Sequence, residues 1–264
     1  MRLAVVIPAK DEEERVAATV RAARTIEGVD VVVVVDDGST DRTALTARVA
    51  GARVVRHHRN RGKAAALESG AALLRDLERP PDGVVHDAEG RALATDEPRA
   101  LLLVDADLGE TAAATAALAV PVLAGEADVA VAVLPRQSSP GGGRGLVVGL
   151  ARRGIVAATG WTPTQPLSGM RCLTRDAFES ARPLAPGWGV ETAMTIDLLR
   201  AGQRVVEVPC ALQHRVSGRG LRAQLHRGRQ YRDVVRALAA RGQLGAVVPK
   251  DERTTARPAE GGGA

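Results

Sequence analysis

Aromatic side chains are scarce in this sequence, making up 2% of its 264 residues. A hydrophobic core therefore has to be built mainly from valine, leucine and alanine, within an apolar content of 45% that is ordinary for a globular protein. Proteins that bind single-stranded nucleic acid stack bases on aromatic rings. The scarcity of such rings argues against a nucleic-acid partner, although the net charge is +5 and the isoelectric point is near 10.

Cysteines are also few. Cys172 and Cys210 lie far apart, and no Cys-x-x-Cys pair occurs. This usage excludes a cysteine-based zinc site and the disulfide framework of a small secreted domain. A reduced, cytoplasmic setting is expected.

Long hydrophobic runs are absent. The nearest candidate, residues 112–134, is interrupted by Pro121, Glu126 and Asp128 and falls short of a membrane span. The N-terminal apolar stretch reaches Pro8 and Lys10 too soon for a signal peptide. We therefore expect a cytoplasmic protein that is at most peripheral to the inner face of the membrane.

Positive charge is concentrated in the C-terminal quarter. A basic segment without aromatics suits an acidic small molecule or an anionic membrane surface. A solvated basic face is the default interpretation of such a run. Its arginines are Arg215, Arg219, Arg222, Arg227, Arg229, Arg232 and Arg236.

Short apolar runs alternate with segments of helical character along most of the chain, and the length suits one large domain. This pattern predicts an α/β fold, with a Rossmann-like, mostly parallel sheet flanked by helices and a C-terminal helical extension. The predicted strands are 3–7, 31–35, 53–55, 101–104, 129–134 and 205–208. The predicted helices are 11–25, 64–77, 111–123, 146–158, one near 176, 190–199 and 221–241. Residues 161–173 are expected to be irregular, and 78–99 to be a polar insertion without identifiable chemistry.

Two carboxylates, Asp105 and Asp107, directly follow the predicted buried strand 101–104. Ligands of open α/β sheets bind at the carboxyl ends of the strands. In an extended segment, residues at positions i and i+2 point to the same side. Two hard oxygen donors so placed suit Mg²⁺ or Mn²⁺, which would hold a diphosphate. For Asp-x-Asp alone, a solvated acidic turn is the competing interpretation.

Three further segments follow predicted strands. Residues 11–14 place acidic side chains in the expected first turn of a helix, where they favour the dipole. In 36–41, Gly38 permits a tight turn, and Ser39 or Thr40 can cap the next helix. Lys63 begins a predicted helix, where a cation is unfavourable, and this placement favours a role facing a ligand.

In this order, segments 5–13, 35–41, 60–63 and 105–107 resemble the nucleotide-sugar half of family-2-like glycosyltransferases with the GT-A fold. The resemblance covers about residues 3 to 108. Segments 165–171, 187–191 and 213–215 resemble the acceptor-side motifs of two groups of relatives, the glucosyl-3-phosphoglycerate synthases and the polyprenyl-phosphate sugar synthases. Each motif alone is weak, and together they are specific.

The resemblance implies roles at a donor site. Glu12 would lie near the ribose, Asp37 would accept a hydrogen bond from the imide N–H of uracil, and Lys63 would neutralise the diphosphate. Asp105 would touch the ribose or the metal's water shell. The alternative for Asp37 is a cap on the next helix. The complete set of donor-binding residues is Pro8, Ala9, Glu12, Asp37, Lys63 and Asp105.

The same resemblance implies Asp107 and His214 as ligands of Mg²⁺ or Mn²⁺, and Glu191 and Asp107 as the catalytic carboxylates. A surface or core role for His214 carries about equal weight. Glu191 would take the proton of the acceptor hydroxyl in an inverting transfer, or orient a sugar in a retaining one. The alternative for Glu191 is a glutamate stabilised at a helix N-terminus.

The acceptor would be held by Ser168 and Gly169 through backbone N–H groups, and by Arg215 and Arg219 through their charge. Residues 1–135 would form the nucleotide-sugar half, 136–245 the acceptor half of the same GT-A domain, and 246–264 a disordered tail.

The expected function is metal-dependent transfer of a hexose from a nucleoside-diphosphate sugar, with UDP-glucose as the expected donor. The anionic acceptor would be a small phosphorylated molecule or a polyprenyl phosphate. Peripheral membrane contact and a homodimer are left open. A nucleotidyltransferase would show a glycine-rich signature after the first strand, which is missing here, and a non-catalytic basic membrane adaptor would leave the acidic strand ends unexplained.

Overall fold

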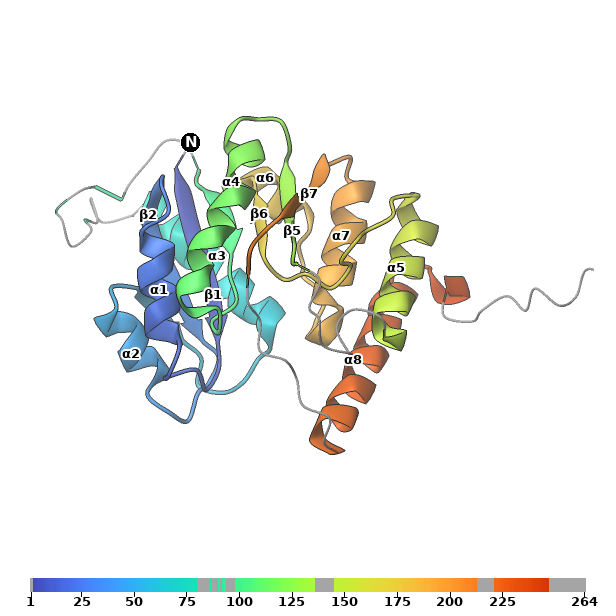
Figure 1. Cartoon of the computed structure of the whole chain (residues 1–264), viewed down its shortest axis with the longest axis horizontal. Helices are drawn as coiled ribbons and strands as arrows, with labels where there is room; N and C mark the ends of the chain where they lie inside the picture. Colours follow the sequence, from blue (N-terminus) through green and yellow to red (C-terminus); the bar gives the residue numbers. More distant parts are fainter. Residues whose placement is uncertain are drawn as a thin grey trace, which may run out of the picture.

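The computed structural model describes residues 2–79, 86, 90, 92–93, 98–135, 145–212 and 221–246, and only the backbone of 221–227 and 246. Seven strands form one sheet in the order β3-β2-β1-β4-β6-β5-β7 (Figure 1). The strands are β1 (Leu3–Ala9), β2 (Val29–Asp36), β3 (Arg53–Arg56), β4 (Ala100–Leu103), β5 (Val129–Val133), β6 (Arg171–Leu173) and β7 (Val205–Pro209).

Helices flank this sheet and extend beyond it at one side (Figure 1). The α-helices are α1 (Val16–Arg24), α2 (Thr43–Val49), α3 (Lys63–Glu78), α4 (Ala116–Leu123), α5 (Leu146–Thr159), α6 (Arg175–Ser180), α7 (Val190–Arg200) and α8 (Leu221–Ala239). Short 3-10 turns are η1 (Gly109–Thr115), η2 (Gly187–Gly189) and η3 (Leu244–Ala246).

The sheet is mostly parallel, as predicted. Parallel pairs join β1 to β2 and β4, β2 to β3, and β5 to β7. Strand β6 runs antiparallel to both β4 and β5. Strand β6 lies within residues 161–173, which were expected to be irregular, because three residues beginning with an arginine carry no local strand signal. Pairing with two neighbours makes it a strand.

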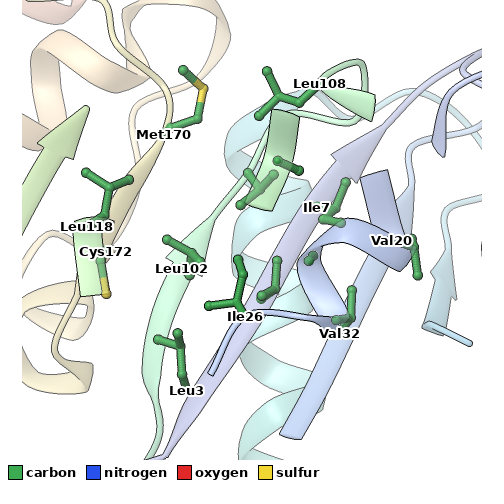
Figure 2. Close-up of a cluster of buried hydrophobic side chains, with 14 of the residues drawn as sticks. Leu3, Ile7, Val20, Ile26, Val32, Leu102, Leu108, Leu118, Met170 and Cys172 are labelled. Carbon is green, nitrogen blue, oxygen red and sulfur yellow. The ribbon is translucent and has the colours of Figure 1, made fainter. Parts of the chain in front are cut away.

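Both faces of the sheet are covered, which explains the unbroken valine runs. In β2, Val32 and Val34 belong to the hydrophobic cluster on one face of the sheet, which also contains residues of α1 and α4 (Figure 2). The alternate residues Val33 and Val35 belong to the cluster on the other face, which also contains residues of α3, α6 and α7. Successive side chains of one strand thus belong to two different hydrophobic cores. Both cores are built mainly from aliphatic residues.

A third, smaller cluster joins α5, α7 and α8 beside the main sheet. Gly154 of α5 lies so close to Leu238 of α8 that a methyl group added at this glycine would collide with the leucine side chain. Close packing at this point and within the cluster fixes α8 against α5 and α7. The predicted C-terminal helical extension is therefore packed against the rest of the fold.

Two local predictions were wrong. Helix α1 begins at Val16 and has no acidic residue in its first turn, so residues 11–14 lie in the turn before it. Strand β4 ends at Leu103, and Asp105 and Asp107 lie beyond it in a turn rather than in an extended segment. The alternation of side chains along a strand therefore does not determine where these two carboxylates point.

The ends of the predicted insertion 78–99 are built into the core. Arg99 has no exposed side-chain surface, and its guanidinium donates to both carboxylate oxygens of Asp30 at 2.7 and 2.8 Å. Glu78 accepts hydrogen bonds from the Arg99 N–H at 3.0 Å and from the Arg175 guanidinium at 2.9 Å. This cluster ties the end of α3 to β2, β4 and α6. The segment contributes to stability, and most of residues 80–97 lie outside the described part.

None of the described helices combines the length and apolar character that a membrane span requires.

Candidate functional site

The predicted site residues that the structure describes gather at the carboxyl edge of the sheet. Strands β1, β2 and β4 are parallel neighbours, so their carboxyl ends meet at one edge. The turns after these strands contain the acidic segments recognised in the sequence. This is the edge at which open α/β sheets bind ligands.

The turns after β1 and β2 hold each other through reciprocal hydrogen bonds. Backbone N–H groups of each turn donate to side chains of the other. The pairs are Asp11 N to Ser39 Oγ (2.9 Å), Glu12 N to Thr43 Oγ1 (2.8 Å), Glu13 N to Asp41 Oδ2 (3.1 Å), Thr40 N to Asp11 Oδ1 (2.8 Å) and Arg42 N to Glu13 Oε2 (2.8 Å). Helix α2 has no side-chain cap, so the prediction that Ser39 or Thr40 caps it was wrong.

Asp11 adopts a left-handed backbone conformation with φ of 55°, which is uncommon for a residue other than glycine. Its carboxylate lies 2.8 Å from the Lys10 ammonium and also accepts from Thr40. The hydrogen bond from Lys10, followed by that from the Thr40 N–H, lowers the pKa of Asp11 below its ordinary value. Strained residues held by their surroundings are typical of functional sites.

The residues expected to line the nucleoside pocket lie together. Pro8 and Ala9 end β1, and the Ala9 carbonyl accepts from the Asp37 N–H at 2.8 Å. Glu12 is half-buried, and its carboxylate lies 3.2 Å from the Arg15 guanidinium. The structure thus brings these residues to one turn, and their contact with a nucleoside stays a prediction.

Asp37 is 5% exposed and accepts three hydrogen bonds. The donors are His57 Nδ1 at 2.7 Å, the Arg61 N–H at 2.8 Å and the Gly62 N–H at 2.7 Å. Burial raises the pKa of Asp37, but the hydrogen bonds from His57 and from the two backbone groups outweigh it, so the pKa is lowered. Asp37 therefore does not cap α2. It fixes the turn that leads into α3.

Lys63 is the first residue of α3, and it connects two carboxylates. Its Nζ lies 2.8 Å from Asp105 Oδ1 and 3.0 Å from Glu191 Oε1. Burial acts to lower the pKa of Lys63, but attraction by Asp105 and Glu191 more than offsets it, so the pKa is raised. The amine is a full positive charge at neutral pH, placed between groups from both halves of the chain.

Glu191 lies in the first turn of α7, directly after the turn η2. This turn packs closely on α8: the Trp188 N–H donates to Asp233 Oδ2 at 3.3 Å. A methyl group at Gly187 would collide with the Asp233 carboxylate, and one at Gly189 would lie 2.6 Å from the Ala237 side chain. Both glycines are needed for this approach, which fixes where α7 begins.

These groups share one cavity of about 130 Å³. One side is charged, with Lys63, Asp105 and Glu191, and another is mainly apolar. The lining residues are Lys63, Asp105, Val147, Leu167, Gly169, Trp188, Glu191 and Gln230. Sequence reasoning missed Val147, Leu167, Trp188 and Gln230 as lining residues. Trp188 lay in a recognised motif, whereas the two aliphatic residues and Gln230 have no motif that marks them.

Gly169 lines this cavity, as its predicted acceptor role requires. A methyl group at this position would collide with Lys63 Nζ and lie 3.3 Å from Asp105 Oδ2. The N–H of Ser168 is already used, because it donates to the Gln165 carbonyl at 3.1 Å. Ser168 therefore has no backbone donor to offer an acceptor phosphate, and its buried hydroxyl has no hydrogen-bond partner within the described chain.

Arg171, a buried residue that sequence reasoning did not select, joins two walls of the cavity. Its Nε donates to the Ser168 carbonyl at 3.1 Å and its Nη2 donates to the Glu191 carbonyl at 3.0 Å. Burial lowers the pKa of Arg171 to about 10, with the Glu191 charge acting in the opposite direction. The strand β6 thus supplies a cation that holds the first turn of α7.

Asp107 and its neighbour Asp105 are the described carboxylates that could hold a metal ion. Within the described ranges no group of three or more histidine, cysteine, aspartate or glutamate side chains could hold a metal ion. The predicted ligand His214, like Arg215 and Arg219, lies outside the described residues. Mg²⁺ is usually bound by one or two carboxylates together with water and substrate phosphates. The two hard carboxylates of this turn fit such an ion, with other ligands completing its shell.

The sequence of this chain is similar to those of known glycosyltransferases. Residues 4–76 match the family model Glycosyl transferase family 2. The chain is 32% identical over 212 residues to the glucosyl-3-phosphoglycerate synthase of Mycolicibacterium paratuberculosis. This alignment covers 74% of this chain and 59% of that protein. This chain therefore spans less than two thirds of the length of that relative.

Solved structures of the glucosyl-3-phosphoglycerate synthase from Mycobacterium tuberculosis share the fold. The complex of that protein with Mg²⁺ and uridine diphosphate superposes with a TM-score of 0.67 at 27% identity, covering 95% of this chain and 81% of the other. Its complex with Mn²⁺, UDP-glucose and phosphoglyceric acid gives a TM-score of 0.64 at 28% identity, with the same coverage.

Proposed function

Because this chain belongs with the family-2-like glycosyltransferases of GT-A fold, we propose that it is a metal-dependent hexosyltransferase. The proposed donor is UDP-glucose, and the proposed acceptor is a small phosphorylated molecule such as phosphoglycerate. Mg²⁺ or Mn²⁺ is the proposed cofactor. The solved complexes of the Mycobacterium tuberculosis relative contain these classes of ligand.

One observation carries the proposal: Lys63, Asp105 and Glu191 converge in one cavity from α3, the turn after β4 and the start of α7. Buried charges are costly unless paired, and perturbed titratable groups in a cleft mark functional sites. Asp105 comes from the predicted donor half and Glu191 from the predicted acceptor half. A cavity between these groups suits a reaction that joins two substrates.

The charges of the cavity suit the departure of a diphosphate. Lys63 carries a full positive charge that can bind a phosphate oxygen once the ion pairs rearrange. Asp107, with Asp105 beside it, would hold the metal, with His214 as a further proposed ligand. A divalent ion supplies charge stabilisation for the leaving diphosphate when it is bound.

We propose that Glu191 acts on the acceptor. Its carboxylate faces Lys63 and lines the cavity, while Arg171 holds its backbone carbonyl. An ionised carboxylate accepts hydrogen bonds only. We therefore assign Glu191 to the acceptor hydroxyl, either as the base that takes its proton or as the group that orients it.

The phosphate of the acceptor would be bound by Arg215 and Arg219, which belong to the segment between β7 and α8. Arginine binds phosphate through paired N–H donors. The remaining arginines of α8 would then form a solvated face or contact an anionic membrane. A polyprenyl phosphate has the same headgroup charge, and it is the competing acceptor.

The test is a direct assay. The chain is incubated with UDP-glucose, 3-phosphoglycerate and Mn²⁺, with UDP release measured and the product mass determined. We expect glucosylated phosphoglycerate as the product. A metal chelator should abolish its formation. UDP release only with polyprenyl phosphate would overturn the proposed acceptor. Formation of UDP-glucose from UTP and glucose 1-phosphate, without transfer, would identify a nucleotidyltransferase instead.

A further inference from the structure

Asp37, His57 and Ser69 form a hydrogen-bonded row beside the proposed site. His57 follows β3 directly and is 6% exposed. Its Nδ1 lies 2.7 Å from Asp37 Oδ1, and its Nε2 lies 2.9 Å from Ser69 Oγ, which belongs to α3. The row therefore connects the ends of β2 and β3 to the helix that begins with Lys63.

The chemistry of the row fixes the hydrogen between His57 and Asp37. The lowered pKa of Asp37, against the effect of burial, leaves an ionised carboxylate that can only accept hydrogen bonds. Nδ1 of His57 must then carry a hydrogen. In the neutral imidazole, Nε2 accepts from the Ser69 hydroxyl. Each member of the row is satisfied without water.

Asp37, which His57 holds in place, is also hydrogen-bonded to the turn before α3. Its two oxygens accept from the N–H groups of Arg61 and Gly62, at 2.8 and 2.7 Å. Helix α3 has no side-chain cap at its N-terminus, where Gly62 has φ of 88°. The same turn lies against Gly38, where an added methyl group would be 2.6 Å from the Arg59 backbone. Asp37 thus fixes the entry into α3, together with the Asn60 side chain, which also accepts from the Gly62 N–H at 2.9 Å.

Helix α3 itself is held against the sheet. A methyl group at Gly70 would lie 2.5 Å from the Val6 side chain, so the helix packs closely on β1. Ser69, the residue before it, bonds to His57. With the helix body fixed, the position of the Lys63 ammonium depends on the entry turn.

We propose that His57 is a positioning residue of the transferase site. It holds Asp37, Asp37 holds the turn at Arg61 and Gly62, and the turn places the Lys63 ammonium between its two carboxylates. The catalytic importance of this placement rests on the proposed function. The placement itself rests on the distances above.

Two substitutions separate this role from simple packing. In His57→Asn the amide N–H takes a position close to that of Nδ1 and can still donate to Asp37. In His57→Gln the amide lies nearer to Nε2, so the bond to Asp37 is lost while more volume is kept. We expect the His57→Asn variant to retain most of the parent's turnover of UDP-glucose with 3-phosphoglycerate. Gln and Ala should lower kcat on the order of 10²-fold, because small displacements of a positioned group cost that much.

If His57 only fills space, Gln will outperform Asn, and the proposal is overturned. The exposed neighbour His58 supplies the matched control, and His58→Ala should keep the parent kcat and KM. The melting temperature of each variant is measured first, and kinetics are compared well below it.

A second readout needs no transferase activity. Acylation of Lys63 by acetic anhydride, followed by mass spectrometry, reports how well its ammonium is held. We expect several-fold faster labelling in His57→Gln than in the parent, with His57→Asn and His58→Ala unchanged. Equal labelling in His57→Gln and the parent would refute the positioning role even in an active enzyme. If no hexose transfer is detected but Lys63 is labelled faster in His57→Gln than in the parent, only the proposed function is refuted.

Discussion

Lys63 is the residue on which the charge arrangement of the cavity depends. It lies between Asp105 and Glu191, and burial would lower its pKa if those carboxylates were absent. The prediction that Lys63 lies at the start of a helix, where a cation is unfavourable, is confirmed, because α3 begins at this residue. The two ion pairs outweigh the unfavourable helix dipole, whose effect is typically below about 1 kcal/mol.

Replacing Lys63 by Ala should lower kcat about 10²- to 10³-fold, as expected when one charge-stabilising group is lost. The fold should persist, because the side chain packs no core. Turnover with UDP-glucose and titration calorimetry with UDP measure the effect. Arg48→Ala removes an exposed cation from α2 as the control. Equal turnover in Lys63→Ala and Arg48→Ala would place Lys63 outside the reaction.

Gly169 tests the same contact from the opposite wall. In Gly169→Ala the new methyl group meets the flexible end of Lys63, so the ammonium is displaced while the backbone is spared. We expect kcat/KM to fall by about tenfold or more with little change in melting temperature. Gly228→Ala, in open space on α8, serves as the comparison and should behave like the parent. Full activity of Gly169→Ala would contradict the required close approach.

Among the elements, those with strong periodic or apolar signals were predicted well. The runs that became β1, β2 and β4 are apolar on both faces, and α3 follows its alanine-rich segment. The short elements β6 and η2 were not predicted. Three residues are too few to show a period, and tertiary partners determine their conformation. Arg171 was missed for the same reason, since its role depends on the carbonyls that surround it.

The cluster around Arg99 gives a prediction about how elements are joined. Arg99→Met removes the buried guanidinium that pairs with Asp30 at 2.7 Å and with Glu78 at 3.5 Å, and should lower the free energy of unfolding by about 3–5 kcal/mol. Arg2→Ala removes a half-exposed cation 3.5 Å from the same Asp30 and should cost less than about 1 kcal/mol. Urea denaturation measures both. Similar losses of unfolding free energy in the two variants would show that burial of the arginine does not determine how much its ion pair contributes to stability.

For the whole molecule, the edge of the sheet at which the described site residues gather was predictable from the order of the elements alone, because parallel strands end together. The partners of each carboxylate were not. Asp37 was expected to face a base or cap α2, yet it also accepts from His57, a residue given no role in the sequence analysis. Such pairings join segments far apart in the chain, and no local spacing encodes them.

The lowered pKa values of several aspartates predict the response of the whole fold to acid. Asp11, Asp37, Asp41 and Asp128 all have folded pKa values below their ordinary value of 3.8. Near and below that pH the unfolded chain binds more protons than the folded one, so protonation favours unfolding. Stability from these groups is fully present above about pH 5 and is lost as the pH falls through their folded pKa values.

We therefore expect the urea midpoint to stay nearly constant between pH 7 and pH 5 and to fall steeply below about pH 4. Asp37→Asn removes one of these groups together with its charge-assisted hydrogen bonds. The variant should be less stable than the parent at pH 7, and the difference should shrink at pH 3, where the parent carboxylate loses its advantage. Urea titrations of both proteins at pH 7, 5 and 3 test this. A difference that stays constant down to pH 3 would mean that the Asp37 carboxylate contributes no stability through its ionised form.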